Sequence, residues 1–282
     1  RTDYYADDFD DSDWDDTEVP GLWQLKGYGQ PLYLCSSMPP AFSTNKNEIP
    51  KINHDLNEIG VYRRNFEIPE SFDGKEIFIH FGAVKAGFFL YINGRQVGYS
   101  QGSMTPAEFR ITDYVTVGEN KITVEVYRYT DGTYLEDQDM WFLSGIYRDV
   151  YVYAEEKLCI RDFFADTSLD DTYTDGTLDL EVTLQNYGEE QDCSLEAAII
   201  VDGKPKKVAA EKLVAKKGKT VLNFSYVEKN ALKWSAEEPN LYKLVLCLKS
   251  GRKVLSAKCI RIGFRKVEIK GNVLCMNGKR VI

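Results

Sequence analysis

The chain has 282 residues, of which 43% are hydrophobic and 13% aromatic, and its formal net charge is -9. This length suits two domains, and the hydrophobic content is enough for a core in each. The negative charge argues against nucleic acid or an anionic membrane as the main partner, because both are bound by cationic surfaces. No apolar run is long enough to span a bilayer.

The N-terminal region carries few regular patterns. It begins with the acidic stretch RTDYYADDFDDSDWDD, which resembles the interior of a longer protein and is compatible with a removed leader. Residues 30–60 then form a long predicted loop with four prolines. Loops of this length in a compact domain are usually functional or disordered, and the aromatic residues Tyr33 and Phe42 favour an ordered surface loop.

Period-two alternation predicts short β-strands along the rest of the chain. Side chains alternate sides in a strand, so each run has one apolar face for a core. Asn-Gly, Asp-Gly and Ser-Gly pairs between the runs suit tight hairpin turns, and no segment sustains a helical period. The predicted fold class is therefore all-β, as sandwiches or jelly rolls. The predicted core faces are Ile77, Ile79 and Phe81; Ile122, Val124 and Val126; Leu178, Leu180, Val182 and Leu184; and Tyr242, Leu244, Leu246 and Leu248.

A domain boundary is predicted near residues 155–161. The strand IYRDVYVYAEE ends there, aromatic residues become rarer and lysines begin to cluster. The lysines around the hairpins are interpreted as a solvated face, with a binding patch as the alternative. The second part of the chain has the length and strand count of a small immunoglobulin-like sandwich.

Cysteine and histidine usage limits the metal chemistry. The cysteines form no CxxC pair, and several lie in apolar strand patterns where a free thiol behaves as a small hydrophobe. We interpret them as reduced thiols and leave both cytoplasmic and periplasmic locations open. His54 and His80 are too few for a multi-histidine zinc site or a histidine-based triad.

The segment from Asp131 to Val150, DGTYLEDQDMWFLSGIYRDV, combines carboxylates with aromatic side chains. Aromatic rings take the apolar face of a pyranose, and carboxylates accept hydrogen bonds from its hydroxyls. The alternative is an acidic loop in which Glu136, Asp137 and Asp139 pair with arginines or backbone N–H groups. For Asp131 the alternative is a turn in which the carboxylate bonds its own backbone.

A catalytic carboxylate pair is a poor interpretation of this segment. Asp137 and Asp139 lie too close in one loop to be placed on opposite sides of a scissile glycosidic bond. The tryptophans elsewhere, Trp14, Trp23 and Trp234, are interpreted as core or corner residues.

Several segments follow one another in a recognisable order. They are DDSDWDDTEVPGLWQLKGYGQPLY, GVYRRNFEIP, NGRQVGYSQGSMTPAEFRIT, DGTYLEDQDMWFLSGIYRDV, WSAEEPNLYKL and the closing GFRKVEI and LCMNGKRVI. In this order they resemble the front part of family 2 glycoside hydrolases, and they look most like the large bacterial-type β-galactosidases. The resemblance spans essentially the whole chain, and DGTYLEDQDMW is its most specific part.

The resemblance implies a domain order. Residues 1–154 would form a jelly-roll, galactose-binding-like domain, although the family's first strand normally precedes FDDSDW. Residues 155–268 would form an immunoglobulin-like β-sandwich, and residues 269–282 would begin a catalytic (β/α)₈ barrel that this chain lacks. In the family the acid/base and nucleophile glutamates belong to the barrel, so no residue of this chain is assigned a catalytic role.

The resemblance also implies one sugar contact. The family's aspartate in the D-G-[ST]-Y motif binds galactose hydroxyls and helps to hold a sodium ion, and Asp131 matches it. The family's asparagine after P-[IL]-Y is matched by Cys35, whose thiol cannot accept and donate as an amide does. This fragment would require no cofactor, whereas the full-length enzyme would use sodium and magnesium and form a homo-oligomer.

Three hypotheses remain open for the function. The first is the non-catalytic front of a β-galactosidase, whose partners are a β-galactoside and its own barrel. The second is a stand-alone carbohydrate-binding module, and the third is a purely structural brace. Within the enzyme class, the front of a β-glucuronidase or β-mannosidase is the alternative, because these enzymes share the fold.

Overall fold

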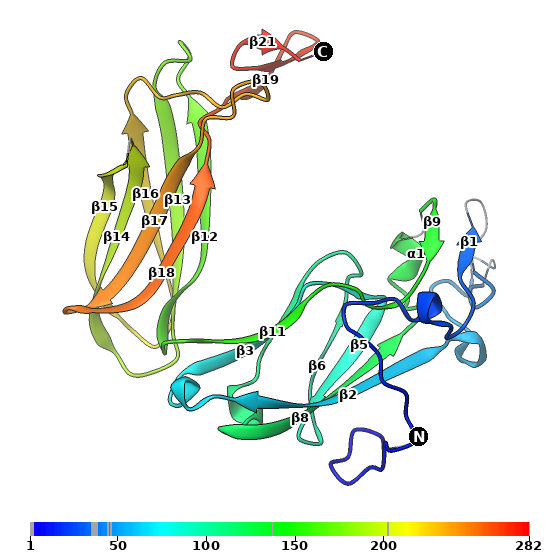
Figure 1. The fold of residues 1–282 in the computed structure, drawn as a ribbon. Coiled ribbons are helices and arrows are strands. Elements are labelled where there is room, and N and C mark those ends of the chain that lie inside the picture. Colours follow the sequence, from blue (N-terminus) through cyan, green and yellow to red (C-terminus); the bar gives the residue numbers. More distant parts are fainter. Residues whose placement is uncertain are drawn as a thin grey trace. The chain divides into compact units, whose positions relative to one another are not determined.

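The computed structural model describes residues 3–34, 39–43, 45, 47–136, 138–201 and 203–281. The chain divides into two compact units, Arg1–Ala154 and Glu155–Ile282, called unit 1 and unit 2 below (Figure 1). Both are built mainly from strands, which confirms the predicted all-β class.

The helical segments of the described residues are all short. None of them is long and apolar enough to cross a membrane. They are η1 (Trp23–Lys26), η2 (His54–Leu56), η3 (Glu70–Phe72), η4 (Thr112–Tyr114) and α1 (Thr133–Glu136).

Unit 1 is a β-sandwich with two main sheets and two small ribbons. The larger sheet has the order β2-β8-β5-β6, the smaller one β11-β3-β7, and the ribbons are β1-β9 and β10-β4. The strands are β1 (Leu32–Leu34), β2 (Ile59–Ile68), β3 (Glu76–Phe81), β4 (Val84–Lys85), β5 (Gly87–Ile92), β6 (Arg95–Gln101), β7 (Ala107–Arg110), β8 (Gly118–Tyr127), β9 (Met140–Phe142), β10 (Gly145–Ile146) and β11 (Val150–Glu155).

The core of unit 1 lies between the two main sheets. The predicted faces of β3 and β8 both reach it, with Ile79 and Phe81 from β3 and Val124 and Val126 from β8 almost fully buried. Asn93 and Gly94 both adopt positive φ in the β5–β6 hairpin, as the predicted tight turn requires.

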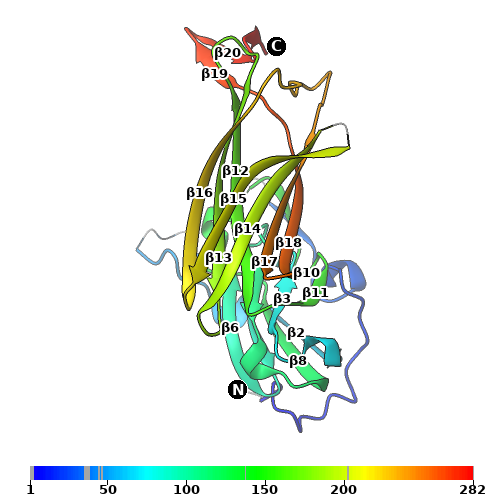
Figure 2. The ribbon, with the colours of Figure 1, turned by 90° about the vertical axis from the view of Figure 1, so that its left-hand side faces the viewer.

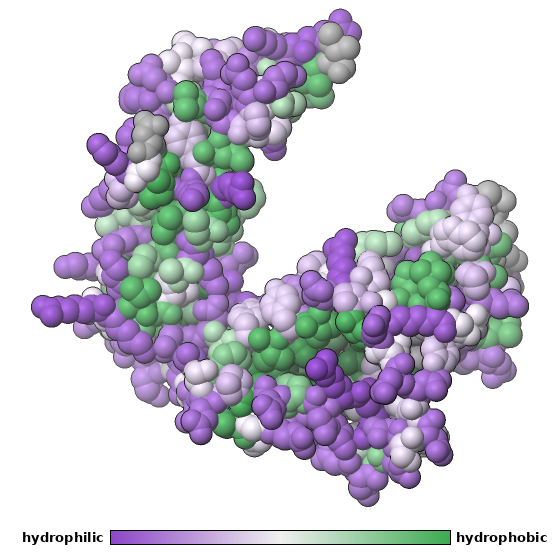
Figure 3. Space-filling model, in the orientation of Figure 1, coloured by the Kyte–Doolittle hydropathy of each residue, from purple (hydrophilic) through white to green (hydrophobic). Residues whose placement is uncertain are grey.

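One side of this core is open between β2 and β11. A groove of about 700 Å³ runs there, and core side chains such as Phe81, Val124 and Val150 line it. Figure 3 shows the hydrophobic surface gathered between these two strands. The groove follows from the sheet orders, because β2 pairs only with β8 and β11 only with β3 among the described strands.

Unit 2 is a sandwich of a three-stranded and a four-stranded sheet, which lie face to face (Figures 1 and 2). The sheet orders are β12-β13-β16 and β15-β14-β17-β18. The strands are β12 (Leu158–Leu169), β13 (Gly176–Asn186), β14 (Gln191–Val201), β15 (Lys204–Ala215), β16 (Gly218–Glu228), β17 (Tyr242–Ser250) and β18 (Lys253–Ile262). This 3 + 4 arrangement confirms the predicted immunoglobulin-like sandwich.

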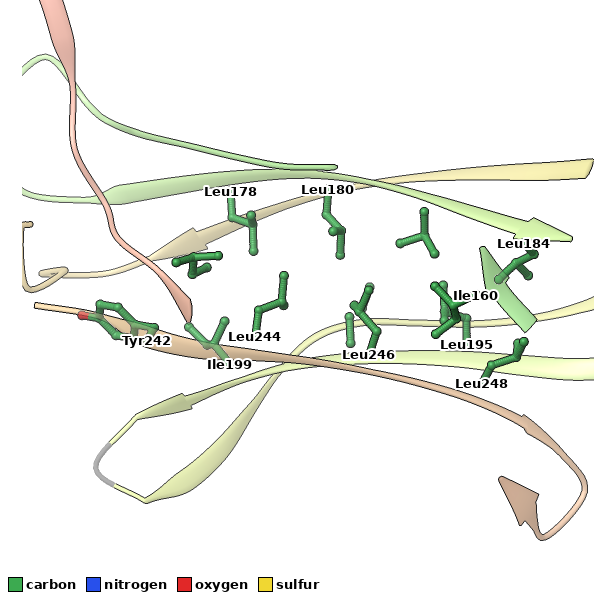
Figure 4. Close-up of a cluster of buried hydrophobic side chains, with 14 of the residues drawn as sticks. Ile160, Leu178, Leu180, Leu184, Leu195, Ile199, Tyr242, Leu244, Leu246 and Leu248 are labelled. Carbon is green, nitrogen blue, oxygen red and sulfur yellow. The ribbon is translucent and has the colours of Figure 1, made fainter. Parts of the chain in front are cut away.

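The alternation in the sequence accounts for the core of unit 2. Leu178, Leu180 and Leu184 of β13 point towards Leu244 and Leu246 of β17 (Figure 4). Every predicted inward residue of these two strands is buried. The described cysteines of the chain, Cys159, Cys193, Cys247, Cys259 and Cys275, are free thiols.

A small three-stranded meander follows this sandwich in unit 2: β19 (Val267–Lys270), β20 (Val273–Met276) and β21 (Lys279–Arg280). One face of β19 contacts Tyr173, whose ring lies under the ammonium groups of Lys266 and Lys270. The Tyr173 hydroxyl donates to Glu268. Val267 and Ile269 alternate with these residues and are 55% and 74% exposed, so the other face of the meander is apolar and open to solvent.

The core of unit 2 gives a direct stability prediction. We expect Leu246→Ala to lower the free energy of unfolding of unit 2 by about 3 kcal/mol, because Leu246 is fully buried and the vacated space cannot collapse. Phe164→Ala, on the outer face of β12, is the control and is expected to cost less than about 0.5 kcal/mol. Urea unfolding measures both, since Trp234 is the tryptophan of unit 2. Equal costs for the two variants would contradict the buried position of Leu246.

Candidate functional site

The site is built on the segment that follows β8. Asn57 holds this segment through both atoms of its amide: Nδ2 donates to the Tyr129 carbonyl at 2.9 Å, and Oδ1 accepts from the Tyr129 N–H at 3.0 Å. The Arg128 N–H adds a bond to the Glu58 carbonyl. The end of the long 30–60 loop therefore fixes the backbone that leads into Asp131.

Arg128 connects the same segment to the β1–β9 ribbon. Its side chain is 4% exposed and pairs with Glu58 at 2.7 Å. The guanidinium also donates to the Gln30 carbonyl at 2.6 Å and to the Phe142 carbonyl at 3.3 Å. Because Gln30 precedes β1 and Phe142 ends β9, one buried cation holds both strands of the ribbon.

Asp131 lies at the surface directly after this fixed segment. Its side chain is exposed, and Oδ1 accepts from the Gly132 N–H at 2.9 Å. Burial, with the nearby negative charge of Asp131 as a second cause, raises the pKa of the Tyr99 hydroxyl. Tyr99 in turn donates to Gln101 at 2.7 Å. The geometry thus combines the local turn bond predicted as the alternative with a carboxylate that remains open to solvent.

Glu136, in the helix that follows Asp131, has structural partners. Both oxygens of Glu136 accept from Ser103, one from its N–H and one from its hydroxyl, which fixes α1 to the loop after β6. The Tyr134 hydroxyl bonds the Ser43 N–H and the Lys51 carbonyl. The prediction that some carboxylates of the segment pair within the protein is confirmed, with Ser103 rather than an arginine as the partner of Glu136. Asp137 lies outside the described residues.

Asp139 lies beside an aromatic pair. It accepts a hydrogen bond from the Tyr33 hydroxyl, and this bond raises the pKa of Tyr33 because a phenolate beside a carboxylate is disfavoured. Tyr33 is directly opposite Trp141 in the β1–β9 ribbon. Figure 1 shows β1, β9 and α1 at one end of unit 1, so the acidic segment and the long loop meet there.

The other two predicted features are the sugar contact of Cys35 and the cation site of Asp131. Cys35, the match to the family's asparagine, lies outside the described residues. No group of three or more His, Cys, Asp or Glu side chains in the described part of the chain is arranged to hold a metal ion. Asp131 therefore provides a single carboxylate, and the described residues do not form a complete cation site around it.

The three tryptophans outside the segment differ in how deeply they are buried. Trp23 is 8% exposed, and a Cβ added to Gly60 would lie 2.3 Å from its ring, so only glycine fits opposite this core residue. Trp234 is stacked against Arg265. Trp14 is 38% exposed and lines a groove of about 500 Å³ together with Tyr28, so it is less buried than the predicted core position requires.

Sequence reasoning missed four partners of the site. Tyr33, Ser103 and Arg128 come from other strands or loops than the residues they contact, and Tyr99 of β6 comes from another strand than Asp131. The one available signal was the motif PLYL, which alternates apolar residues around Tyr33 and so places its ring on the outer face of a strand.

Comparison with protein families gives two matches that together cover most of the chain. Residues 5–156 match the model described as "Glycosyl hydrolases family 2, sugar binding domain". Residues 158–265 match the model described as "Glycosyl hydrolases family 2". The two matches follow the two structural units closely.

Curated relatives are similar over the whole chain. A β-galactosidase of Priestia megaterium is 39% identical over 286 residues, and the alignment covers 99% of this chain and 27% of the relative. A β-galactosidase of Halalkalibacterium halodurans is 38% identical over 280 residues, with 99% and 27% covered. The chain thus spans about a quarter of the length of these relatives.

Solved structures share the fold at lower identity. A β-glucuronidase of Bacteroides uniformis has a TM-score of 0.81 at 23% identity, with 99% of this chain and 32% of that chain covered. A β-glycosidase of Bacteroides vulgatus has a TM-score of 0.72 at 20% identity, with 98% and 33% covered. At these identities the similarity shows the fold alone.

Proposed function

The chain belongs to glycosyl hydrolase family 2, and on this premise we propose that it is the non-catalytic front part of a β-galactosidase. In the full-length protein, terminal β-D-galactosides would be hydrolysed with retention of configuration. Unit 1 would contribute Asp131 to the galactose subsite, and both units would brace a catalytic barrel. In this proposal residues 1–154 are the sugar-binding domain, residues 155–268 the immunoglobulin-like domain, and residues 269–282 the start of the barrel.

The observation that carries the proposal is the setting of Asp131. Its carboxylate is exposed, whereas the backbone before it is held by Asn57, Glu58 and buried Arg128. Recognition of sugar hydroxyls needs an accessible acceptor on a rigid support. A mobile carboxylate would lose conformational entropy on binding, and this loss would weaken the affinity for the sugar. The curated relatives, which are β-galactosidases at 38–39% identity, support galactose as the sugar.

The meander of unit 2 supports the bracing role. Val267, Ile269 and Leu274 are exposed on one of its faces, although each would gain about 1.5–3 kcal/mol from full burial. We assign this face to contact with the barrel. The barrel would also supply the acid/base and nucleophile glutamates, so this chain by itself would not hydrolyse a glycoside.

The ions of the full-length protein are part of the same proposal. Asp131 would give one oxygen ligand to a sodium ion, and the other ligands would come from outside the described residues. Magnesium and assembly into a homo-oligomer are proposed for the full-length protein only.

Expression of the full-length protein tests the function. We expect it to cleave 4-nitrophenyl β-D-galactopyranoside, with NMR detecting the β-anomer of galactose as first product, and the 282-residue chain alone to show no turnover. Faster cleavage of the corresponding β-glucuronide or β-mannoside would reject galactose as the substrate. Inverted product configuration would reject the retaining mechanism.

A further inference from the structure

The β1–β9 ribbon has two different faces. Leu32, Leu34 and Phe142 point inwards and pack with Phe42 and Tyr129 in a small apolar cluster of their own. Because side chains alternate in a strand, Tyr33 and Trp141 must point to the other face. The inward face and the bonds of Arg128 therefore hold the ribbon on unit 1, and this packing does not use the outward rings.

The outward face carries two large aromatic rings. Tyr33 and Trp141 are register partners, their ring centroids lie 5.6 Å apart, and the planes are tilted by 47°. The residues remain 49% and 55% exposed. A solvated strand face usually carries polar residues, so two adjacent exposed rings are the arrangement of a ligand surface rather than of a core.

Asp139 adds polar groups at the edge of this surface. Its Oδ1 accepts a hydrogen bond from the Tyr33 hydroxyl, and this bond holds the phenol ring in the pair. A carboxylate has two acceptor oxygens, and a phenol that donates can still accept. The surface therefore combines apolar ring faces with hydrogen-bond acceptors directly beside them.

We propose that Tyr33, Trp141 and Asp139 form a stacking platform for a pyranose ring, as a second carbohydrate subsite in addition to that of Asp131. The C–H face of the sugar would lie on the rings, and its equatorial hydroxyls would donate to Asp139. The ligand class is a neutral β-linked galactosaccharide of two or more units, a choice that rests on the proposed function. Trp141 and Asp139 follow Asp131 in the same segment, DGTYLEDQDMW.

The chemistry of the platform favours a sugar over a protein partner. Covering a carboxylate with protein is costly unless donors satisfy it, because a buried charge loses its hydration. A pyranose has hydroxyl donors around the edge of its apolar C–H face, so it could satisfy the Asp139 carboxylate and cover the two aromatic rings at the same time. The platform also lies within residues 5–156, which match a family model described as a sugar-binding domain.

Titration of the 282-residue chain tests the platform. The probes are β-1,4-galactotetraose and methyl β-D-galactoside, and the readouts are calorimetry and tryptophan fluorescence. We expect Trp141→Ala to weaken tetraose binding at least tenfold and Trp141→Phe, which keeps a ring, to restore it to within threefold of the unchanged chain. Binding should shift the emission of the unchanged chain but not that of Trp141→Phe, because Trp141 is the reporter.

Two further variants separate the platform from the galactose subsite. Phe164→Ala removes an even more exposed ring from unit 2 and should bind the tetraose normally. Asp131→Ala should weaken both probes, whereas Trp141→Ala should leave the affinity for methyl galactoside unchanged. If Trp141→Ala binds the tetraose as the unchanged chain does, or if the unchanged chain binds no tetraose, the platform is rejected. If Asp131→Ala binds both probes as the unchanged chain does, while Trp141→Ala weakens tetraose binding, the proposed galactose subsite is rejected and the platform stands.

Discussion

Asp131→Ala in the full-length protein is expected to lower kcat/KM for an aryl β-galactoside by at least about 100-fold, or about 2.7 kcal/mol. In the proposed function the carboxylate would accept hydrogen bonds from sugar hydroxyls, and its removal would leave those hydroxyls without their partner in the bound state. Asp131→Asn keeps the shape and the acceptor for the Gly132 N–H but loses the charge. It should therefore fall between Asp131→Ala and the unchanged protein. Steady-state kinetics on 4-nitrophenyl β-D-galactopyranoside measure both.

A purely local role for Asp131 gives a different result. If the carboxylate only stabilises its own turn, Asp131→Ala would lower the unfolding midpoint of unit 1 and leave kcat/KM close to its starting value. Asp166→Ala is the matched control, because Asp166 is an exposed carboxylate on the outer face of β12 in unit 2. Unchanged turnover of the Asp131→Ala protein would contradict the proposed sugar contact.

Arg128→Met is expected to destabilise unit 1 by about 3 kcal/mol or more. Methionine fills a similar volume but cannot donate hydrogen bonds. The change would leave the Gln30 and Phe142 carbonyls without their donor and Glu58 without its cation. Because the guanidinium is 4% exposed, water cannot replace it without opening the ribbon. The cost should therefore appear together with a loosened β1–β9 ribbon.

Urea unfolding of the 282-residue chain measures this effect. Trp14, Trp23 and Trp141 belong to unit 1 and Trp234 to unit 2, so fluorescence reports mainly on unit 1, which carries this change. Arg148→Met, at an exposed arginine of the same unit, is the control and should change the stability by less than about 0.5 kcal/mol. A loss of less than 1 kcal/mol for Arg128→Met would mean that Arg128 does not hold the ribbon.

Two carboxylates of the segment that contains Trp141 show why composition alone did not locate the site. Glu136 and Asp139 have the same residue chemistry and lie three positions apart, yet Glu136 is tied to Ser103 and Asp139 to Tyr33. A carboxylate accepts from whatever donor the fold brings within reach, and both donors come from distant parts of the chain. The acidic character of the segment was visible in the sequence, whereas the division of roles was not.

The amino-acid sequence by itself determined the all-β class and most of the strands with their buried faces, but not β1, which lies inside the predicted 30–60 loop. Period-two alternation places Leu178 and Leu180, or Leu244 and Leu246, on one side of a strand before any partner is known, because the alternation is a property of the extended backbone. The order of the segments that resemble family 2 glycoside hydrolases further indicated the family, and the resemblance singled out Asp131 as a candidate sugar contact.

Only the tertiary structure decided which strands pair and which side chains meet. Tyr33 and Trp141 lie more than a hundred positions apart in the chain, and Arg128 reaches Gln30 and Phe142 through contacts between separate elements. Such contacts depend on strand register and loop closure, which alternation within one strand does not encode. The candidate platform and the buried cation that supports it therefore became visible only once β1 and β9 were placed side by side.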